Sequence, residues 1–249
     1  AVRIMMAVIT IFAALVLSWI WVYYRSYSGV DPAFVPYLRH GVFAGLIFVD
    51  PMYFFISEKG TPGAGDNMIA VAAIIKLAEI FNRAKQNGAG LLKNTRLMFL
   101  SADAEEAGLR GARAFVKRHR GALLKMPTYH FNIDSIYNLG ELQFLTRDIN
   151  SVVRLSKNMA RECKAVADQL GYRTRLFAIT PGGGATDAAE FAKAGVEATT
   201  LIGMPTNLIR DGMVYHTLQD NVEHIEPEAV EATLKIAFVY ILNKERDNI

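Results

Sequence analysis

Residues 96–118 read RLMFLSADAEEAGLRGARAFVKR and show how this chain is organised. The first six, Arg96–Ser101, are short and mostly apolar, which is typical of a buried strand. Residues 104–118 have the composition of a helix. Two adjacent acids, Glu105 and Glu106, fall where the predicted strand passes into the predicted helix. This stretch therefore predicts an α/β unit with acidic side chains at the carboxyl end of a strand.

The same alternation of apolar strands and helices continues on both sides of this stretch. Upstream, Val42–Ile56 predicts a buried strand that leads into a loop; a second membrane segment is the alternative, disfavoured by its Asp and Pro. Apolar residues at helical spacing predict a helix over Asn67–Gln86. Further strands are expected at 129–133, 174–179 and 198–202, and further helices at 150–170 and 226–244. The fold class is therefore α/β: a three-layer sandwich with a mostly parallel central sheet and helices on both faces.

The first 24 residues form the most apolar stretch of the chain. Ile4–Tyr24 contains no charged residue and is long enough to cross a hydrocarbon core of roughly 30 Å. Aromatic residues gather near its C-terminal end, as they do at membrane interfaces: Trp19, Trp21, Tyr23 and Tyr24. We expect one transmembrane helix that contacts membrane lipid through residues 4–24. The alternatives are a buried helix of a soluble domain and a cleaved signal peptide, which this length disfavours.

This segment suggests three parts: a transmembrane anchor at 1–24, a juxtamembrane connector at 25–41 and a catalytic domain at 42–249. The chain is then a single-pass membrane protein. One arginine on each side of the apolar run, Arg3 and Arg25, leaves the side of the membrane undecided.

The composition excludes several classes of function. A formal net charge of +3 over 249 residues is small and scattered, which argues against a nucleic-acid partner. The single cysteine, Cys163, excludes an internal disulfide and a cysteine-based zinc cluster.

Acidic and imidazole side chains occur at the ends of the predicted strands. The candidates are Asp66, Glu105, Glu106, Asp134 and His216. Each one alone is more often structural, as a helix N-cap or a solvated helix face. Together they offer the carboxylate and imidazole ligands that suit a divalent ion such as zinc. The sequence therefore predicts a metal-dependent hydrolase.

Five motifs make the interpretation more specific: GAGDN at 63–67, SADAEEAGLRGARAF at 101–115, FNID at 131–134, GGGATDAAEF at 182–191 and VYHTLQD at 214–220. On these motifs the chain, from about Leu46 to Leu242, resembles the zinc aminopeptidases of the bacterial leucyl aminopeptidase type. Glutamate carboxypeptidase and glutaminyl cyclase are relatives of that family. The resemblance implies a peptide substrate and zinc as the cofactor.

The resemblance also implies a role for each matching residue. Asp66 would bridge two zinc ions, Glu106 and His216 would complete the first metal site, and Asp134 would bind the second metal. Glu105 would be the general base that takes a proton from the attacking water.

Four further residues would surround these groups. Tyr215, Asp187 and Asp220 are expected beside the substrate or in support of the ligands, and Thr186 at the pocket wall with Asp187.

The chain departs from the family at one segment. The family's H-x-D segment aligns with residues 51–54, which places Met52 and Phe54 where the family has His and Asp. The second metal would keep only Asp134 and the shared Asp66, and two oxygen ligands are too few for a stable tetrahedral site. We therefore expect one firmly bound zinc ion and a second that is weak or absent.

Three functions remain open. The first is a membrane-anchored metallo-aminopeptidase that removes N-terminal residues from peptides, with Glu105 as general base. The second is a catalytically impaired relative that acts as a binding module, which Met52 and Phe54 favour and the retained Glu105–Glu106 pair disfavours. The third is carboxypeptidase or cyclase chemistry at the same centre.

Overall fold

The computed structural model describes residues 2–26, 35–53, 60–180, 183–205 and 214–247. The chain divides into two compact units, Ala1–Gly60 and Thr61–Ile249, called here the helical unit and the sheet unit.

The helical unit consists of two helices, α1 (Val2–Ser26) and α2 (Val35–Tyr53), which pack on each other. Gly45 permits this close approach, because a Cβ there would lie 2.7 Å from the ring of Phe12. The strand predicted over Val42–Ile56 is therefore wrong: residues 42–53 are helical, and residues 54–56 lie outside the described residues. An apolar run of this length fits a helix as well as a strand, and its pattern alone does not separate the two.

Helix α1 is the one described helix that is long and apolar enough to cross a membrane, over Val8–Arg25. This is a statement about its length and composition alone, and a signal sequence or a core helix meets the same test. One side chain near its end, Val22, is buried within the structure, with 4% of its surface exposed.

The sheet unit is built on five strands. They are β1 (Tyr129–Ile136), β2 (Leu142–Asp148), β3 (Val153–Arg154), β4 (Arg175–Ala178) and β5 (Glu197–Gly203). Their order is β1-β5-β2-β3, and β4 also pairs with β2. Strand β1 runs parallel to β5, and β4 parallel to β2, whereas β2 is antiparallel to both β5 and β3.

The sheet is thus mixed rather than mostly parallel. Only residues 137–141 connect β1 to β2, and a parallel return needs a crossover of about a dozen residues or more. Strand β2 therefore runs back in the opposite direction.

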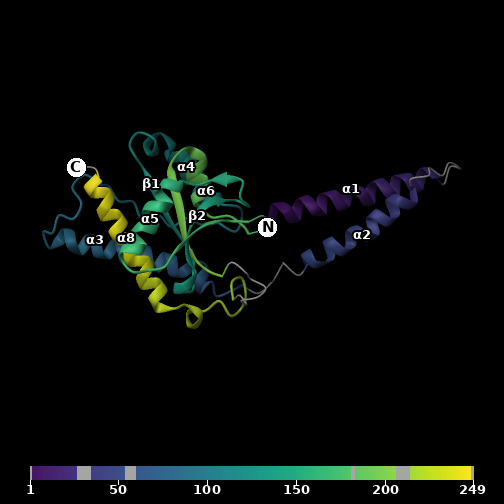
Figure 1. Ribbon diagram of the computed structural model, residues 1–249. Coiled ribbons are helices and arrows are strands. Elements are labelled where there is room, and N and C mark those ends of the chain that lie inside the picture. The colour runs from purple at the N-terminus through teal and green to yellow at the C-terminus, as the bar shows by residue number, and fades with distance from the viewer. Residues whose placement is uncertain (1, 27–34, 54–59, 181–182, 206–213, 248–249) are drawn as a thin grey trace. The chain divides into compact units, whose positions relative to one another are not determined.

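Helices cover both faces of this sheet (Figure 1). Helices α3 (Ile69–Gln86), α5 (Lys157–Gln169) and α8 (Pro227–Asp247) contribute to one hydrophobic core. Helices α4 (Arg110–Leu123) and α6 (Ala188–Ala194) contribute to another. Phe144 and Leu145 of β2 are both fully buried, one in each core, because successive side chains of a strand point to opposite faces. The three-layer sandwich expected from the sequence is confirmed.

The local structure differs from the sequence predictions at further places. Residues 96–101 form no strand, and Met98 and Phe99 are 56% and 39% exposed, because this apolar segment does not pair with β1. The helix predicted from residue 150 begins only at Lys157, where Ser156 caps it by accepting from the Met159 amide at 3.2 Å. Strand β2 was not predicted at all, although it is central to the sheet.

Candidate metal centre

Asp66 lies in the turn that precedes helix α3, and Asp220 fixes the backbone of this turn. The Asp220 carboxylate accepts from the amides of Gly65 at 2.8 Å and Asp66 at 3.3 Å. Asp220 is 1% exposed. Only glycine fits at position 65, because a Cβ there would lie 2.0 Å from the Tyr137 ring. The position of the Asp66 carboxylate is therefore set by buried backbone contacts.

Glu105 and Glu106 lie in a tight turn just before α4, not at the end of a strand. The Glu105 carbonyl accepts from the amides of Gly108 at 2.8 Å and Leu109 at 2.7 Å. Helix α4 begins only at Arg110, later than the sequence predicted, because residues 105–109 form this turn.

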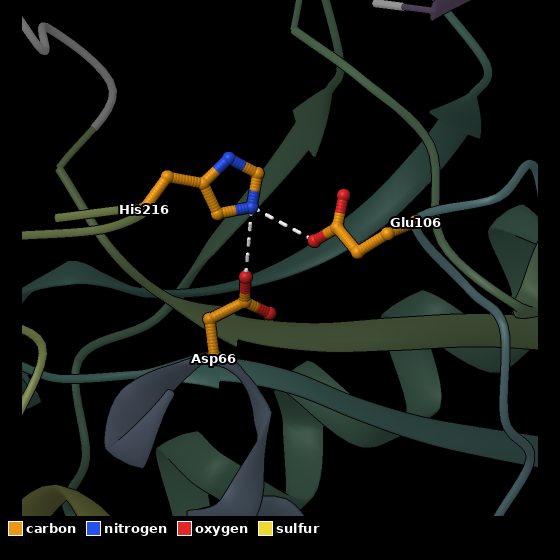
Figure 2. Close-up of side chains that lie close together, drawn as sticks. All are labelled: Asp66, Glu106 and His216. Atoms are coloured by element: carbon orange, nitrogen blue, oxygen red, sulfur yellow. Dashed lines mark hydrogen bonds and ion pairs between the residues drawn. The ribbon is translucent and has the colours of Figure 1, made fainter. Parts of the chain in front are cut away.

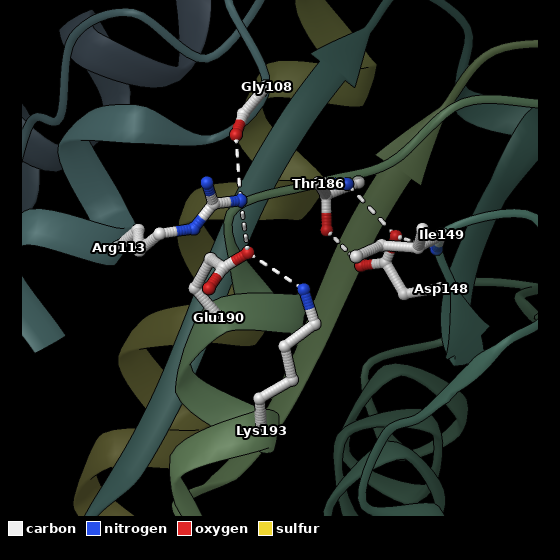
Figure 3. Close-up of polar contacts among 7 residues, drawn as sticks. All are labelled: Gly108, Arg113, Asp148, Ile149, Thr186, Glu190 and Lys193. Carbon is white, nitrogen blue, oxygen red and sulfur yellow. Dashed lines mark hydrogen bonds and ion pairs between the residues drawn. The ribbon is translucent and has the colours of Figure 1, made fainter. Parts of the chain in front are cut away.

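A partly buried ion pair connects this turn to helix α6 (Figure 3). Arg113 donates to the Gly108 carbonyl and to Glu190 Oε1, both at 3.0 Å, and Lys193 donates to the same Glu190 oxygen at 2.8 Å. Burial raises the pKa of Glu190, but the hydrogen bonds from Arg113 and Lys193 outweigh it and leave this pKa lowered. Glu190 is therefore an anion that holds the Glu105–Gly108 turn through Arg113.

His216 is presented by a tight turn before α8. The Thr217 amide donates to the Val214 carbonyl at 2.9 Å, and His216 itself has a positive φ of 58°. The ring of Tyr215 stacks on the imidazole, with centroids 3.8 Å apart and planes 16° apart. The backbone turn and the stacked ring together orient the imidazole.

Three side chains from separate segments converge at this point (Figure 2). His216 Nε2 lies 3.1 Å from Asp66 Oδ2 and 2.8 Å from Glu106 Oε1. Among the residues that the structure describes, these three form a set whose ligand atoms all lie within 4.8 Å of one another. The structure thus brings together the residues expected at the first metal site.

The electrostatics of this cluster match the needs of a cation. Hydrogen bonds to Asp66 and then Glu106 raise the pKa of His216 to about 10. The hydrogen bond with His216 lowers the pKa of Glu106. The proton on His216 therefore offsets the negative charge of Asp66 and Glu106, at the place where a metal ion would offset it. Two carboxylate oxygens and one imidazole nitrogen are a donor set that fits zinc.

Asp134, which is buried, and Glu105, which is half-buried, add two carboxyl groups beside the cluster. Asp134 pairs with Ile202 just before a shift in the β1–β5 register, and it accepts from Ser135 Oγ at 3.0 Å. Burial, and then the charge of Asp66, raises the pKa of Asp134 to about 8. Burial, and then the charge of Asp134, raises the pKa of Glu105 to about 8. Ser135 was not predicted from the sequence, although it directly follows the FNID motif.

Asp187 lies before α6 and directly follows Thr186. Thr186 and Asp148 form a buried hydrogen-bond network (Figure 3). Asp148 accepts from the Thr186 amide at 2.9 Å and from Thr186 Oγ1 at 2.6 Å. Burial, and then the charge of Asp148, raises the pKa of Asp187 to about 6. Sequence analysis missed Asp148 because it missed strand β2, whose polar residues Gln143, Thr146 and Arg147 interrupt the apolar pattern.

A cavity of about 590 Å³ opens beside the cluster. Its lining includes the carboxyl groups of Asp66, Glu105, Glu106, Asp134 and Asp187. Most other lining side chains are apolar, such as Ile74, Leu97 and Phe131. The cluster therefore borders a space large enough for a ligand.

The prediction about the second metal site depends on residues 51–54. The side chains of residues 51–53 are not described, and Phe54 lies outside the described residues. The consequence drawn from Met52 and Phe54 stays a prediction.

Comparisons with solved structures show the same fold in three bacterial proteins. The zinc aminopeptidase BSAP from Bacillus subtilis matches with a TM-score of 0.59 and 21% identity, over 74% of this chain and 42% of that chain. The aminopeptidase from Aneurinibacillus sp. strain AM-1 matches with a TM-score of 0.59 and 22% identity, over 74% and 40%. LapB from Legionella pneumophila matches with a TM-score of 0.60 and 16% identity, over 74% and 48%. At these identities the likeness shows the fold.

Sequence comparison agrees with this likeness. The chain is 23% identical to the aminopeptidase YwaD of Bacillus subtilis (strain 168) over 171 residues, which are 69% of this chain and 35% of that protein. The chain thus spans about a third of the length of this curated relative. Residues 49–241 match Peptidase family M28, and these residues include all five motifs and the whole cluster. The chain therefore belongs to Peptidase family M28.

Proposed function

We propose that this protein is a membrane-anchored, zinc-dependent aminopeptidase that removes N-terminal residues from peptides. The convergence of Asp66, Glu106 and His216 carries this proposal, because Asp66 and Glu106 line one cavity together with Glu105. Membership of Peptidase family M28 and the fold shared with bacterial aminopeptidases support it.

Asp66, Glu106 and His216 would hold the zinc ion. A bound zinc ion supplies a Lewis acid for the scissile carbonyl and lowers the pKa of water. Glu105 also lines the cavity, and it is not one of the three residues that would bind the zinc ion. Its carboxylate takes a proton from the attacking water and delivers it to the leaving amine. Two adjacent glutamates thereby acquire different roles.

The acidic surroundings support an amino-terminal substrate. Asp134 and Asp187 line the same cavity as Asp66 and Glu106. The charges of both raise the pKa of Glu105. A protonated amino end placed there would offset the repulsion that raises the pKa of these carboxyl groups, so the charged amine and the ionised carboxyl groups favour each other. Binding there places the first peptide bond next to Glu105.

We further propose that one zinc ion is held firmly and a second weakly or not at all. The three-residue set contains Asp66, Glu106 and His216, and Asp134 is not a member of it. Helix α1 would be the membrane anchor, since its length and composition suit a membrane span.

A binding module without catalysis is the second candidate. The observation that favours it is the sequence itself, which has Met52 and Phe54 at the aligned metal-ligand segment.

The test is hydrolysis of a leucyl dipeptide by the full chain with zinc, with chelator, and with zinc restored. The proposal predicts hydrolysis that chelator abolishes and zinc restores. Absence of hydrolysis with zinc and with cobalt contradicts the aminopeptidase and favours the binding module.

A further inference from the structure

The helical unit exposes large apolar side chains on both of its helices. In the segment Val8–Arg25 of α1, 6% of the residues are buried, although α2 packs on this helix. Ile11 and Leu17 of α1 are 62% and 66% exposed, and Phe43 and Ile47 of α2 are 62% and 73% exposed. Soluble proteins rarely leave such continuous apolar surface in water. The surface of α2 therefore needs an apolar partner as much as the surface of α1 does.

The contact between the helices aligns them in depth. They run antiparallel and are connected by residues 27–34 (Figure 1). They approach most closely at Gly45, where a Cβ would lie 2.7 Å from the ring of Phe12. Gly45 of α2 is therefore at the level of Phe12 of α1, which lies ~20 Å from Arg25 at ~1.5 Å per residue. Every other residue of α2 can be placed along α1 from this contact.

On this alignment the charged residues of α2 lie toward the two ends of the apolar segment of α1. Asp50 is ~8 Å beyond Gly45, and thus ~27 Å from the level of Arg25, where a hydrocarbon core is ~30 Å thick. Arg39 is ~9 Å from Gly45 in the other direction, and long basic side chains near helix ends reach the interface. Residues 41–49 between them are uncharged. The Asp-Pro pair that counts against a membrane segment in the sequence therefore lies at the level of a membrane surface.

Aromatic side chains of both helices occur at one level near the connecting residues. Trp21 lies ~14 Å from the level of Phe12, and Tyr37 lies ~12 Å from the level of Gly45, both toward residues 27–34. Trp21 and Tyr37 are 59% and 78% exposed, and the guanidinium of Arg25 lies 5.0 Å from the centre of the Trp21 ring. Tryptophan and tyrosine are enriched at the interface between membrane and water. The two helices thus contribute to one aromatic belt.

Lipid is the partner that fits this surface. A protein partner would leave a polar rim around an apolar centre, whereas here the exposed apolar side chains continue along both helices. The hydroxyl of Ser18, in the middle of α1, donates to the Ala14 carbonyl at 2.7 Å. It is therefore satisfied within its own helix, as a polar group in hydrocarbon must be.

We propose that α1 and α2 form one helical hairpin that crosses the membrane twice. Helix α2 contains Arg39, His40 and Asp50, so it depends on packing against α1 to stay in the lipid. Residues 27–34 then lie on one side of the membrane, and the start of α1 and the chain after α2 lie on the other. This inference rests on the proposed anchor α1 and is independent of the proposed catalysis. It replaces the single pass predicted from the sequence with two.

The first experiment labels single introduced cysteines with a membrane-impermeant maleimide in right-side-out vesicles that carry the full chain. Cys163 is fully buried, so the unaltered chain serves as the blank. Val2→Cys and Thr61→Cys should react from the same side of the membrane, and Ser28→Cys from the opposite side. Reaction of Ser28→Cys and Thr61→Cys from one side would overturn the hairpin and leave α1 as a single-pass anchor. Release of the chain by alkaline carbonate would contradict both the anchor and the hairpin.

A cysteine in the middle of α2 tests its depth separately from its direction. Ile47 is 73% exposed, so an aqueous maleimide would reach a cysteine there if α2 lay in water. In the hairpin, Ile47→Cys should lose this labelling from both sides of the vesicle, and it should react once the chain is denatured. Labelling of Ile47→Cys in intact vesicles, at the rate of Thr61→Cys, would overturn the proposal.

Two glycines of α2 give a matched pair of variants for the packing. A Cβ at Gly45 meets the Phe12 ring, whereas a Cβ at Gly41 has nothing within 4 Å. Gly45→Leu and Gly41→Leu add the same apolar side chain, so only the contact with α1 differs. Gly45→Leu should lower the fraction of chains in which Thr61→Cys and Ser28→Cys react from opposite sides, and Gly41→Leu should leave it unchanged. Equal fractions in the two variants would contradict a hairpin held by this contact.

Discussion

Strands β2 and β1 lie on opposite sides of β5, yet their surroundings differ. β2 pairs with β3, β4 and β5, and its residues Leu142, Phe144 and Leu145 are fully buried. β1 pairs on one side only, and its other side borders the cavity and the cluster of carboxyl groups. The comparison indicates that β2 mainly stabilises the sheet, whereas the residues beside β1 mainly serve function. Substitutions at β2 should lower stability. Substitutions at the rim, which means here Asp66, Glu105, Glu106 and His216 beside β1, should lower activity.

The largest effect is expected at the rim. Glu105→Gln should reduce kcat by about 10²–10⁴-fold, because the amide takes no proton from water. The free energy of unfolding should not fall, because Glu105 forms no ion pair among the described residues and the neighbouring acids repel its charge. Steady-state kinetics and thermal unfolding of the same preparation measure both. Unchanged kcat would remove Glu105 from the mechanism.

Phe144→Ala tests the other strand. It leaves a cavity in a fully buried site and should lower the free energy of unfolding by about 3–5 kcal/mol. The zinc affinity of the folded fraction should stay near that of the unchanged protein. Denaturant titration measures the first quantity and metal titration the second. A large loss of affinity with little loss of stability would break the separation.

The pH dependence of zinc binding sharpens the comparison at the cluster. In the metal-free protein Asp66 and then Glu106 raise the pKa of His216 to about 10, so His216 carries a proton at neutral pH. Zinc must displace that proton, and its affinity should therefore rise with pH, by about tenfold per unit between about pH 6 and pH 8. Calorimetry in two buffers of different ionisation heat measures the proton release. An affinity that does not vary with pH would mean that His216 binds no metal.

The smallest effect is expected at the contact that holds the acidic turn. Glu190→Gln keeps an acceptor for Arg113 but removes the charge, and should weaken zinc binding about tenfold, the lower end for groups behind metal ligands. Glu79→Gln is the matched control, because Glu79 forms exposed pairs within α3 and such pairs contribute little. Equal affinities in the two variants would show that Glu190 does not position the turn.

The sequence predicts these two regions to different degrees. Motifs identify the rim: Asp66, Glu106 and His216 lie on separate segments, and the structure brings them together as the family resemblance implies. Most strands and helices of the sheet unit follow from apolar periodicity, and helices α3 and α8 occur close to the expected residues. These features depend on local pattern.

The predictions that failed depend on strand pairing, which joins residues distant in the sequence. Residues 96–101 are apolar enough for a strand but have no partner, and residues 42–53 are equally compatible with a helix, which they form. Strand β2 carries Gln143, Thr146 and Arg147 among its apolar residues, and this mixture hides its central position. Ser135, Asp148 and Glu190 acquire their roles only through neighbours distant in sequence.

The most direct test of the central claim is a crystal of the protein grown with zinc and measured at the zinc absorption edge. The account predicts an anomalous peak bonded to Asp66, Glu106 and His216 together, with any second peak near Asp134 much weaker. A peak elsewhere, or none among these three side chains, would contradict it.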